Sequence, residues 1–155
     1  DPIVLISEEI QHAKHYINIM KIRYGDQIDF IWDIDEKLMS SKTIRLTLQP
    51  VIENAIYHGI RPKQSEGIIE ISCRTDESGE VIIFSVTDNG IGIPENILQK
   101  IIEEINTDEA GGSIGLHNIQ SRIKLYFGEE YGISIFSKES EGTTVEIRIP
   151  NTQKK

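Results

Sequence analysis

The stretch VTDNGIGIP, residues 86–94, decides how the whole sequence is interpreted. It ends a run of small apolar residues and places Asp88 ahead of two glycines, Gly90 and Gly92. A hairpin turn with a capping aspartate would account for the acid and the first glycine alone. The alternative is a binding loop, because a strand-end carboxylate accepts hydrogen bonds in a fixed direction and glycines let backbone approach a flat ring. The second glycine favours the loop, with Asp88 accepting from an adenine amine.

The elements predicted on either side of this stretch combine strands with long amphipathic helices. Apolar residues recur at helical spacing in some segments and alternate with polar ones in others. This order predicts a two-layer α/β sandwich, with helices over one face of a largely antiparallel sheet. The predicted helices are 7–24, 42–60, a short one from Pro94 to about 105, and 115–127; the predicted strands are 28–34, 67–74, 80–88, 132–137 and 143–149, and 106–114 is a predicted loop.

Length and charge exclude several classes of protein. The 155 residues suit one domain, and the single cysteine, Cys73, cannot form an internal disulfide. A net charge of −9 argues against a nucleic-acid-binding domain, which usually has a basic face. No run approaches the roughly 20 apolar residues of a membrane span, so we expect no direct membrane contact within this sequence. The abrupt start at Asp1 is what a piece of a longer chain would have.

One face of the predicted helix 42–60 carries polar side chains. Asn54, Tyr57, His58 and Arg61 share this face at helical spacing, opposite an apolar stripe. An amide oxygen is a hard neutral ligand that suits Mg²⁺ when phosphates and water supply the other oxygens. The tyrosine, histidine and arginine are then candidates for phosphate contacts. Simple exposure to solvent explains the same pattern, and both interpretations remain open on this helix alone.

Two further glycine motifs are candidates for ligand contacts. Residues 111–116, GGSIGL, lead into a helix, where unpaired N–H groups and the helix dipole favour an anion. A flexible loop with a helix cap is the alternative, and the lysine of a P-loop is missing. Gly142 and Thr143 open the last strand, where a hydroxyl could reach a base through water or merely follow a tight turn.

The order of these motifs carries a family resemblance. LQPVIENAIYHGI (48–60), GLHNIQSRIKLYFG (115–128) and GTTVEIRIP (142–150) resemble the ATP-binding domain of bacterial sensor histidine kinases, in the gyrase, Hsp90, histidine kinase and MutL superfamily. More narrowly they resemble the LytS-like subfamily, as does SEEIQHAKHYINIMKIRYGD (7–26) with the segment ahead of that domain. The resemblance covers residues 7–150. It implies the Bergerat fold, of the α+β class, in which about three helices cover a mixed, mostly antiparallel sheet.

The resemblance also implies roles for individual residues. Asn54 would coordinate Mg²⁺, Asp88 would bind the adenine amine, and residues 106–114 would be a mobile lid over ATP. Glu53 would be a base or outer-sphere candidate beside Asn54, and His58 is a catalytic candidate with them. The residues implied to bind the nucleotide are Asn54, Tyr57, His58, Asp88, Gly90, Gly92, Ile93, Gly111, Gly112, Ser113, Gly115, Leu116 and Thr143.

The sequence departs from the family pattern at two positions of the second helix. Pro50 stands where the superfamily's ATPases carry a catalytic glutamate, which argues against a hydrolase. Tyr57 stands where many histidine kinases carry lysine, so His58, Arg61 or Lys63 would have to supply contacts to phosphate.

The resemblance implies that different segments of a longer protein carry different functions. Residues 1–25 would be a helical connector from a dimerisation segment, 26–150 the catalytic domain, and 151–155 a disordered tail. Bound ATP would phosphorylate a histidine on that separate segment, for relay to an aspartate of a response regulator; His12 and His15 are interpreted as surface residues. The domain would be cytoplasmic, behind an anchor in the bacterial inner membrane. A superfamily ATPase or serine kinase, and a degenerate partner-binding module without nucleotide, are the alternatives.

Overall fold

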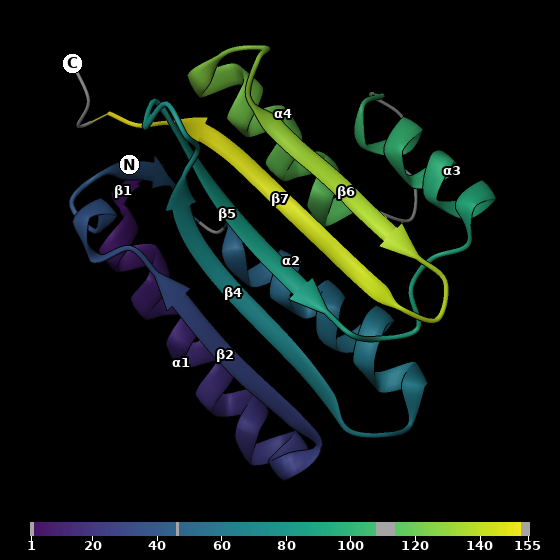
Figure 1. The fold of residues 1–155 in the computed structure, drawn as a ribbon. Coiled ribbons are helices and arrows are strands. Elements are labelled where there is room, and N and C mark those ends of the chain that lie inside the picture. The colour runs from purple at the N-terminus through teal and green to yellow at the C-terminus, as the bar shows by residue number, and fades with distance from the viewer. Residues whose placement is uncertain (1, 46, 108–113, 153–155) are drawn as a thin grey trace.

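A five-stranded sheet with helices on one face forms the body of the molecule (Figure 1). The computed structural model describes residues 2–45, 47–107 and 114–152. The strand order is β2-β4-β5-β7-β6, in which β2 runs parallel to β4 and all other neighbours are antiparallel. The mixed sheet confirms the predicted fold class. Its strands are β2 (Ile28–Ile34), β4 (Gly67–Thr75), β5 (Val81–Asp88), β6 (Gly132–Lys138) and β7 (Gly142–Pro150).

Helices α1, α2 and α4 lie behind the sheet in Figure 1, and α3 lies beside β6. Their inward stripes are aliphatic and follow the 3.6-residue period, which is why they form helices that pack on a sheet. On α4, Leu116, Ile119 and Ile123 are buried, whereas Tyr126 is 47% exposed and Phe127 packs partly against the core. The bounds are α1 (Ile6–Tyr24), α2 (Leu48–Asn54), α3 (Glu95–Ile105) and α4 (Ile114–Phe127).

The helix predicted over 42–60 is wrong in its first turns. Residues Lys42–Ile44 form strand β3, which pairs antiparallel with β1 (Ile3–Leu5) in a small separate sheet. The β-branched Thr43 and Ile44 are completely buried there, and such side chains fit a pleated, packed surface better than a helix. Helix α2 therefore begins only at Leu48.

The C-terminal half of that segment is helical but not regular. Beyond Asn54 the chain continues as a π-helix over Ala55–Ile60 and ends in a 3₁₀ turn over Arg61–Lys63. Wide π turns occur often at functional sites, because they rotate the following side chains relative to an α-helix. The positions after Asn54 therefore do not keep the spacing that the sequence pattern assumes.

The end of the chain is held where the sequence predicts a disordered tail. Asn151 donates its backbone N–H to the Glu80 carbonyl at 2.8 Å and its side-chain amide to the Gly79 carbonyl at 2.9 Å. The backbone N–H of Lys42 donates to the Thr152 hydroxyl at 3.3 Å. Residues 153–155 lie outside the described residues, so the prediction for them stays a prediction.

Candidate functional site

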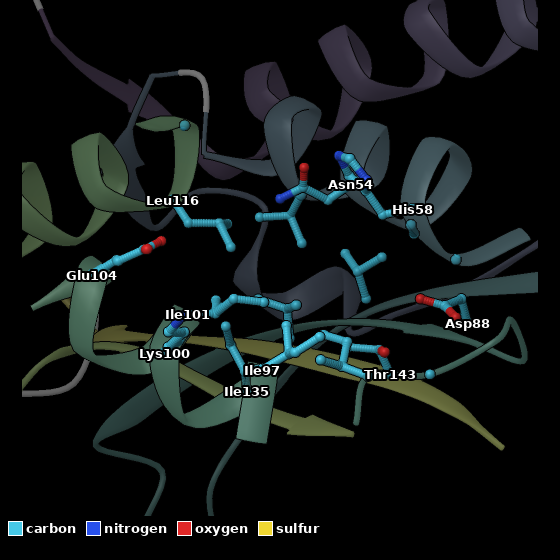
Figure 2. Close-up of a pocket in the computed structure, with 18 of the residues that line it drawn as sticks. Asn54, His58, Asp88, Ile97, Lys100, Ile101, Glu104, Leu116, Ile135 and Thr143 are labelled. Atoms are coloured by element: carbon cyan, nitrogen blue, oxygen red, sulfur yellow. The ribbon is translucent and has the colours of Figure 1, made fainter. Parts of the chain in front are cut away.

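A cavity of about 510 Å³ lies between the helix that carries Asn54, the helices α3 and α4, and the inner face of the sheet (Figure 2). It draws residues from seven elements that are far apart in the sequence. Most of its wall is aliphatic. The lining residues are Val51, Asn54, Ala55, His58, Gly59, Val86, Asp88, Gly92, Ile93, Pro94, Ile97, Lys100, Ile101, Glu104, Gly115, Leu116, Ile135, Thr143 and Val145.

Asp88 supplies a buried carboxylate at one end of this cavity. It is the last residue of β5, pairs in register with Thr143 of β7, and is only 6% exposed. One carboxylate oxygen accepts the backbone N–H of Gly90 at 2.8 Å. Burial raises the pKa of Asp88, partly offset by the backbone N–H groups of Gly90 and Thr143 and by the charge of Lys63. The site thus holds an acceptor that a ligand donor would stabilise.

The loop after Asp88 approaches the Asn54 helix closely enough to require glycine. The backbone N–H of Ile91 donates to the Gly59 carbonyl at 3.1 Å, and a Cβ on Gly90 would collide with the Gly59 backbone. Gly92 has φ +70 and faces the Lys138 carbonyl, so a side chain there would be strained and blocked. Both glycines of the motif are therefore required by the geometry that seats Asp88.

Asn54 and His58 stand along the helical wall of the cavity, between its two ends (Figure 2). Asn54 is half-buried at the end of α2, and His58 is exposed in the π-helix that follows. Thr143 lies near Asp88 in the figure, and its hydroxyl is 2.7 Å from that of Ser137. These three predicted residues and Asp88 thus meet in one place.

Two other predicted residues of the same helix do not line the cavity. Tyr57 points toward α1, where Arg23 donates to its hydroxyl at 3.4 Å. The Glu53 carboxylate accepts a hydrogen bond from Gln49 at 3.0 Å, one turn earlier on the helix. Neither residue is among those that line the cavity, and their roles in ligand binding stay predictions. The expected common face fails because the helix is wedged between α1 and the cavity and changes to π geometry after Asn54.

The cations proposed to replace a lysine at position 57 are also placed away from the cavity. The Arg61 guanidinium lies 5.8 Å from the centre of the Tyr57 ring, and the Lys63 ammonium donates to the Asn89 carbonyl at 3.0 Å. Of the three candidates, only His58 lines the cavity.

The far end of the cavity contains residues that the sequence interpretation missed. Lys100 and Glu104, one turn apart on α3, lie opposite Asp88 in Figure 2. Ile97 and Ile101 from the same helix complete this wall. Their spacing of three and four residues is a helical-face signal, but it resembles any surface helix until the partner surface is known.

Part of the predicted glycine-rich lid can be located. Gly115 and Leu116 in the first turn of α4 line the cavity, as does Ile93 after Gly92. Gly111, Gly112 and Ser113 lie outside the described residues, so their predicted contacts stay predictions. The described lining offers an apolar slot with an acceptor at one end, an amide and an imidazole on one wall, and a cation at the other end.

The described residues contain no group of three histidine, cysteine, aspartate or glutamate side chains that could hold a metal ion. They also contain no helix that is both long enough and apolar enough to cross a membrane.

The chain matches a known protein family over most of its length. The profile of the family described as "Histidine kinase-, DNA gyrase B-, and HSP90-like ATPase" matches residues 40–153. The chain is 36% identical over 148 residues to the sensor histidine kinase YesM of Bacillus subtilis (strain 168), covering 96% of this chain. It is 39% identical over 147 residues to the sensor histidine kinase YpdA of Escherichia coli (strain K12), covering 94% of this chain. In both cases it spans 24% of the relative's length.

Solved structures agree on the fold. The nucleotide-free catalytic domain of the histidine kinase ThkA superimposes with a TM-score of 0.67 at 20% identity, covering 96% of this chain and 95% of that one. A mycobacterial sensor histidine kinase, MprB, gives a TM-score of 0.65 at 16% identity, with 96% of each chain covered. The chain therefore belongs to the histidine kinase-, DNA gyrase B- and HSP90-like ATPase family, as an ATP-binding domain similar in sequence to part of its sensor-kinase relatives.

Proposed function

We propose that this domain binds Mg²⁺–ATP in the cavity, with adenine at the Asp88 end. The observation that carries the proposal is a buried carboxylate at one end of a cavity whose wall is mostly aliphatic. The backbone N–H groups of Gly90 and Thr143 already donate to this carboxylate, and an ionised carboxylate has capacity for a further donor such as the exocyclic amine of adenine, which sits on a flat ring. Val86, Ile135 and Val145 supply the apolar surface against which the ring would pack.

The residues present fit a magnesium ion that arrives with the nucleotide. Asn54 offers one neutral oxygen ligand on the cavity wall, and the described residues hold no cluster of acidic ligands that would bind the ion alone. Mg²⁺ characteristically takes one or two protein oxygens and completes its shell with phosphate oxygens and water. Bound there, the ion would neutralise charge on the phosphates.

We further propose that the bound ATP serves a histidine kinase reaction. The γ-phosphoryl group would leave the β-phosphate oxygen and bond to an imidazole nitrogen, releasing ADP and the imidazole proton. The acceptor histidine would lie on the dimerisation helices of the full-length protein, and an aspartate of a response regulator would receive the group next. The protein's task in such transfers is mostly positioning and charge neutralisation. Similarity to sensor histidine kinases four times longer supports this proposal.

The histidines of this chain do not offer an obvious internal acceptor. His12 and His15 are exposed on α1 and are hydrogen-bonded to Gln49 and Gln11, at 2.6 and 2.9 Å. His117 is bonded to the Ile105 carbonyl at 3.1 Å. The fourth histidine, His58, lines the cavity as part of the proposed nucleotide site and not as an acceptor. We therefore expect no autophosphorylation of this sequence. We also assign the domain to the cytoplasmic side of a parent anchored in the bacterial inner membrane, on its likeness to sensor kinases.

Calorimetric titration tests nucleotide binding directly. ATP and ADP should bind the wild-type domain in the presence of Mg²⁺, and Asp88→Asn should weaken both by about 10- to 100-fold, the contribution of a hydrogen bond to a charged group. Asp29→Asn, an equal charge change at an exposed position of β2, is the matched control and should leave affinity unchanged. No binding by the wild-type domain, or equal binding by Asp88→Asn, would contradict the proposal.

The transfer step needs the full-length protein. Incubation with ATP radiolabelled on the γ-phosphate should label it with an acid-labile, alkali-stable phosphoryl group, as expected for phosphohistidine, and Asn54→Ala should abolish the label. Steady ATP hydrolysis by the isolated domain, also lost in Asn54→Ala, would instead indicate a superfamily ATPase.

A further inference from the structure

The charge of the cavity is unbalanced for a polyphosphate ligand. The described lining residues include two carboxylates, Asp88 and Glu104, and a single lysine or arginine, Lys100. The whole chain carries a net charge of −9, so its overall field does not favour an anion. A triphosphate in this cavity therefore depends on local donors.

Lys100 is available for such a contact. Its side chain is exposed where α3 meets the cavity, and within the described ranges no ion pair or hydrogen bond engages its ammonium. The other basic side chains near the Asn54 helix are engaged elsewhere, Arg61 against the Tyr57 ring and Lys63 on the Asn89 carbonyl. A long, flexible ammonium with three donors can follow a phosphate chain without a fixed geometry.

The position of Lys100 relative to Asp88 fixes which part of a nucleotide it could reach. Figure 2 shows the two residues at opposite ends of the cavity, with Asn54 on the wall between them. If the base occupies the Asp88 end, the sugar and phosphates must extend past Asn54 toward α3 and the first turn of α4. Leu116, in the first turn of α4, also lies toward that end in Figure 2.

We propose that Lys100 on α3 is the cation that contacts the β- and γ-phosphates of the bound nucleotide, and that Glu104 one turn later weakens this contact. The inference rests on the proposed function, because it assumes that Asp88 holds the base. It moves the phosphate-binding charge from the Asn54 helix to α3, the helix on the opposite side of the cavity.

A series of ligands with increasing numbers of phosphates distinguishes a phosphate contact by Lys100 from any other role of this residue. Adenosine, AMP, ADP and ATP should be titrated by calorimetry, at constant Mg²⁺, into the wild type, Lys100→Ala, Lys100→Arg and Glu104→Gln. Lys21→Ala, which removes an exposed charge from α1, controls for the change in net charge. Thermal unfolding of each variant shows whether the fold is intact.

We expect Lys100→Ala to weaken ADP and ATP by about tenfold, the lower end of the range for a charge-assisted hydrogen bond, and to leave adenosine unchanged. Lys100→Arg should restore most of the affinity, Lys21→Ala should match the wild type, and Glu104→Gln should tighten ATP by about twofold, as for a partly screened like charge.

Two results would overturn the inference while leaving the proposed function intact. One is ATP affinity within about twofold of wild type in Lys100→Ala while Asp88→Asn binds weakly. The other is an equal loss for adenosine and ATP, which would locate the effect at the base or in the fold. Absence of any binding by the wild type would instead contradict the proposed function, and this inference with it.

Discussion

The two sides of the Asn54 helix differ in how they are filled. On the side of α1 the helix meets a dense aliphatic layer in which Ile6, Ile10, Ala13 and Ile17 are at most 1% exposed. On the side of α3 and α4 it borders a cavity of about 510 Å³. One helix is thus a core element along one edge and a wall of the site along the other. The difference indicates that folding free energy and ligand binding are carried by different neighbours of the same helix.

Polar contacts strengthen the packed side as well. The carboxylate of Glu9 on α1 is 2% exposed and accepts from the backbone N–H of Thr47, the Thr47 hydroxyl and the backbone N–H of Leu48, at 2.6, 3.0 and 3.1 Å. It accepts hydrogen bonds from the first backbone N–H groups of α2, which receive no capping hydrogen bond from the N-cap side chain of that helix. The helix is therefore fixed from α1, and the cavity can stay open without loosening Asn54.

The largest expected effect compares matched isoleucines from the two sides. Ile17→Ala on α1 should lower the free energy of unfolding by about 2–5 kcal/mol, the cost of a cavity in a packed core, with little change in ATP affinity. Ile97→Ala on α3, where the side chain is 46% exposed and lines the cavity, should cost little stability and weaken ATP. Denaturant unfolding and calorimetry measure both quantities.

If both isoleucine variants changed stability and ATP affinity in the same proportion, the α1 side and the cavity side of the Asn54 helix would form one cooperative unit. The proposed separation of folding and binding between these sides would then be wrong.

Substitution of Gly59 tests how narrow the cavity is at its Asp88 end. A Cβ on Gly59 would lie 2.7 Å from the Asp88 carboxyl carbon, so Gly59→Ala must displace that side chain. We expect ATP affinity to fall by about 10- to 100-fold, as for loss of the Asp88 hydrogen bond, with a smaller effect on stability. ATP affinity equal to that of the wild type in Gly59→Ala would show that Asp88 is not held as tightly as the geometry indicates.

The cap provided by Glu9 gives a smaller effect on the packed side. Glu9→Gln keeps the shape but loses the charge and part of the acceptor capacity, so we expect about 1 kcal/mol lower stability, in the range of a lost helix cap. ATP affinity should change little. Glu70→Gln, an equal charge change at an exposed position of β4, is the control for thermal and denaturant unfolding. A large loss of affinity at unchanged stability would show that the α1 side belongs functionally to the site.

The sequence predicts the fold well where the pattern is local. Each of the five strands of the main sheet and the helices α1, α3 and α4 lie within a few residues of the expected bounds. The spacing of Asp88, Gly90 and Gly92 also predicts a loop after a strand-end carboxylate. The sequence assigns these glycines to the approach of a flat ring, whereas in the structure Gly90 faces the Gly59 backbone and Gly92 the Lys138 carbonyl.

What the sequence does not predict depends on tertiary contacts. Lys42–Ile44 become a strand only because β1 pairs with them, and the π turn after Asn54 directs Tyr57 toward α1. Lys100 gives no signal of its own, since an exposed lysine on an amphipathic helix is ordinary until the cavity beside it is known. The spacing of residues on one helix therefore does not predict which of them line a site when the helix has neighbours on several sides.

The smallest expected effect concerns the free energy of unfolding that is lost when the ionised Asp88 carboxylate is buried at one end of the cavity. Burial raises the pKa of Asp88 above its ordinary value of 3.8, so between the unfolded and folded pKa values the folded state binds more protons. Stability from this group therefore falls as the pH rises through that window and stays reduced above it. Asp88→Asn should thus be slightly more stable than wild type at neutral pH, and the gain should vanish below pH 3.8. Denaturant unfolding across pH measures this. A gain in stability that did not depend on pH would mean that ionisation of the Asp88 carboxylate does not oppose folding. The cavity would then carry its buried charge without lowering the free energy of unfolding.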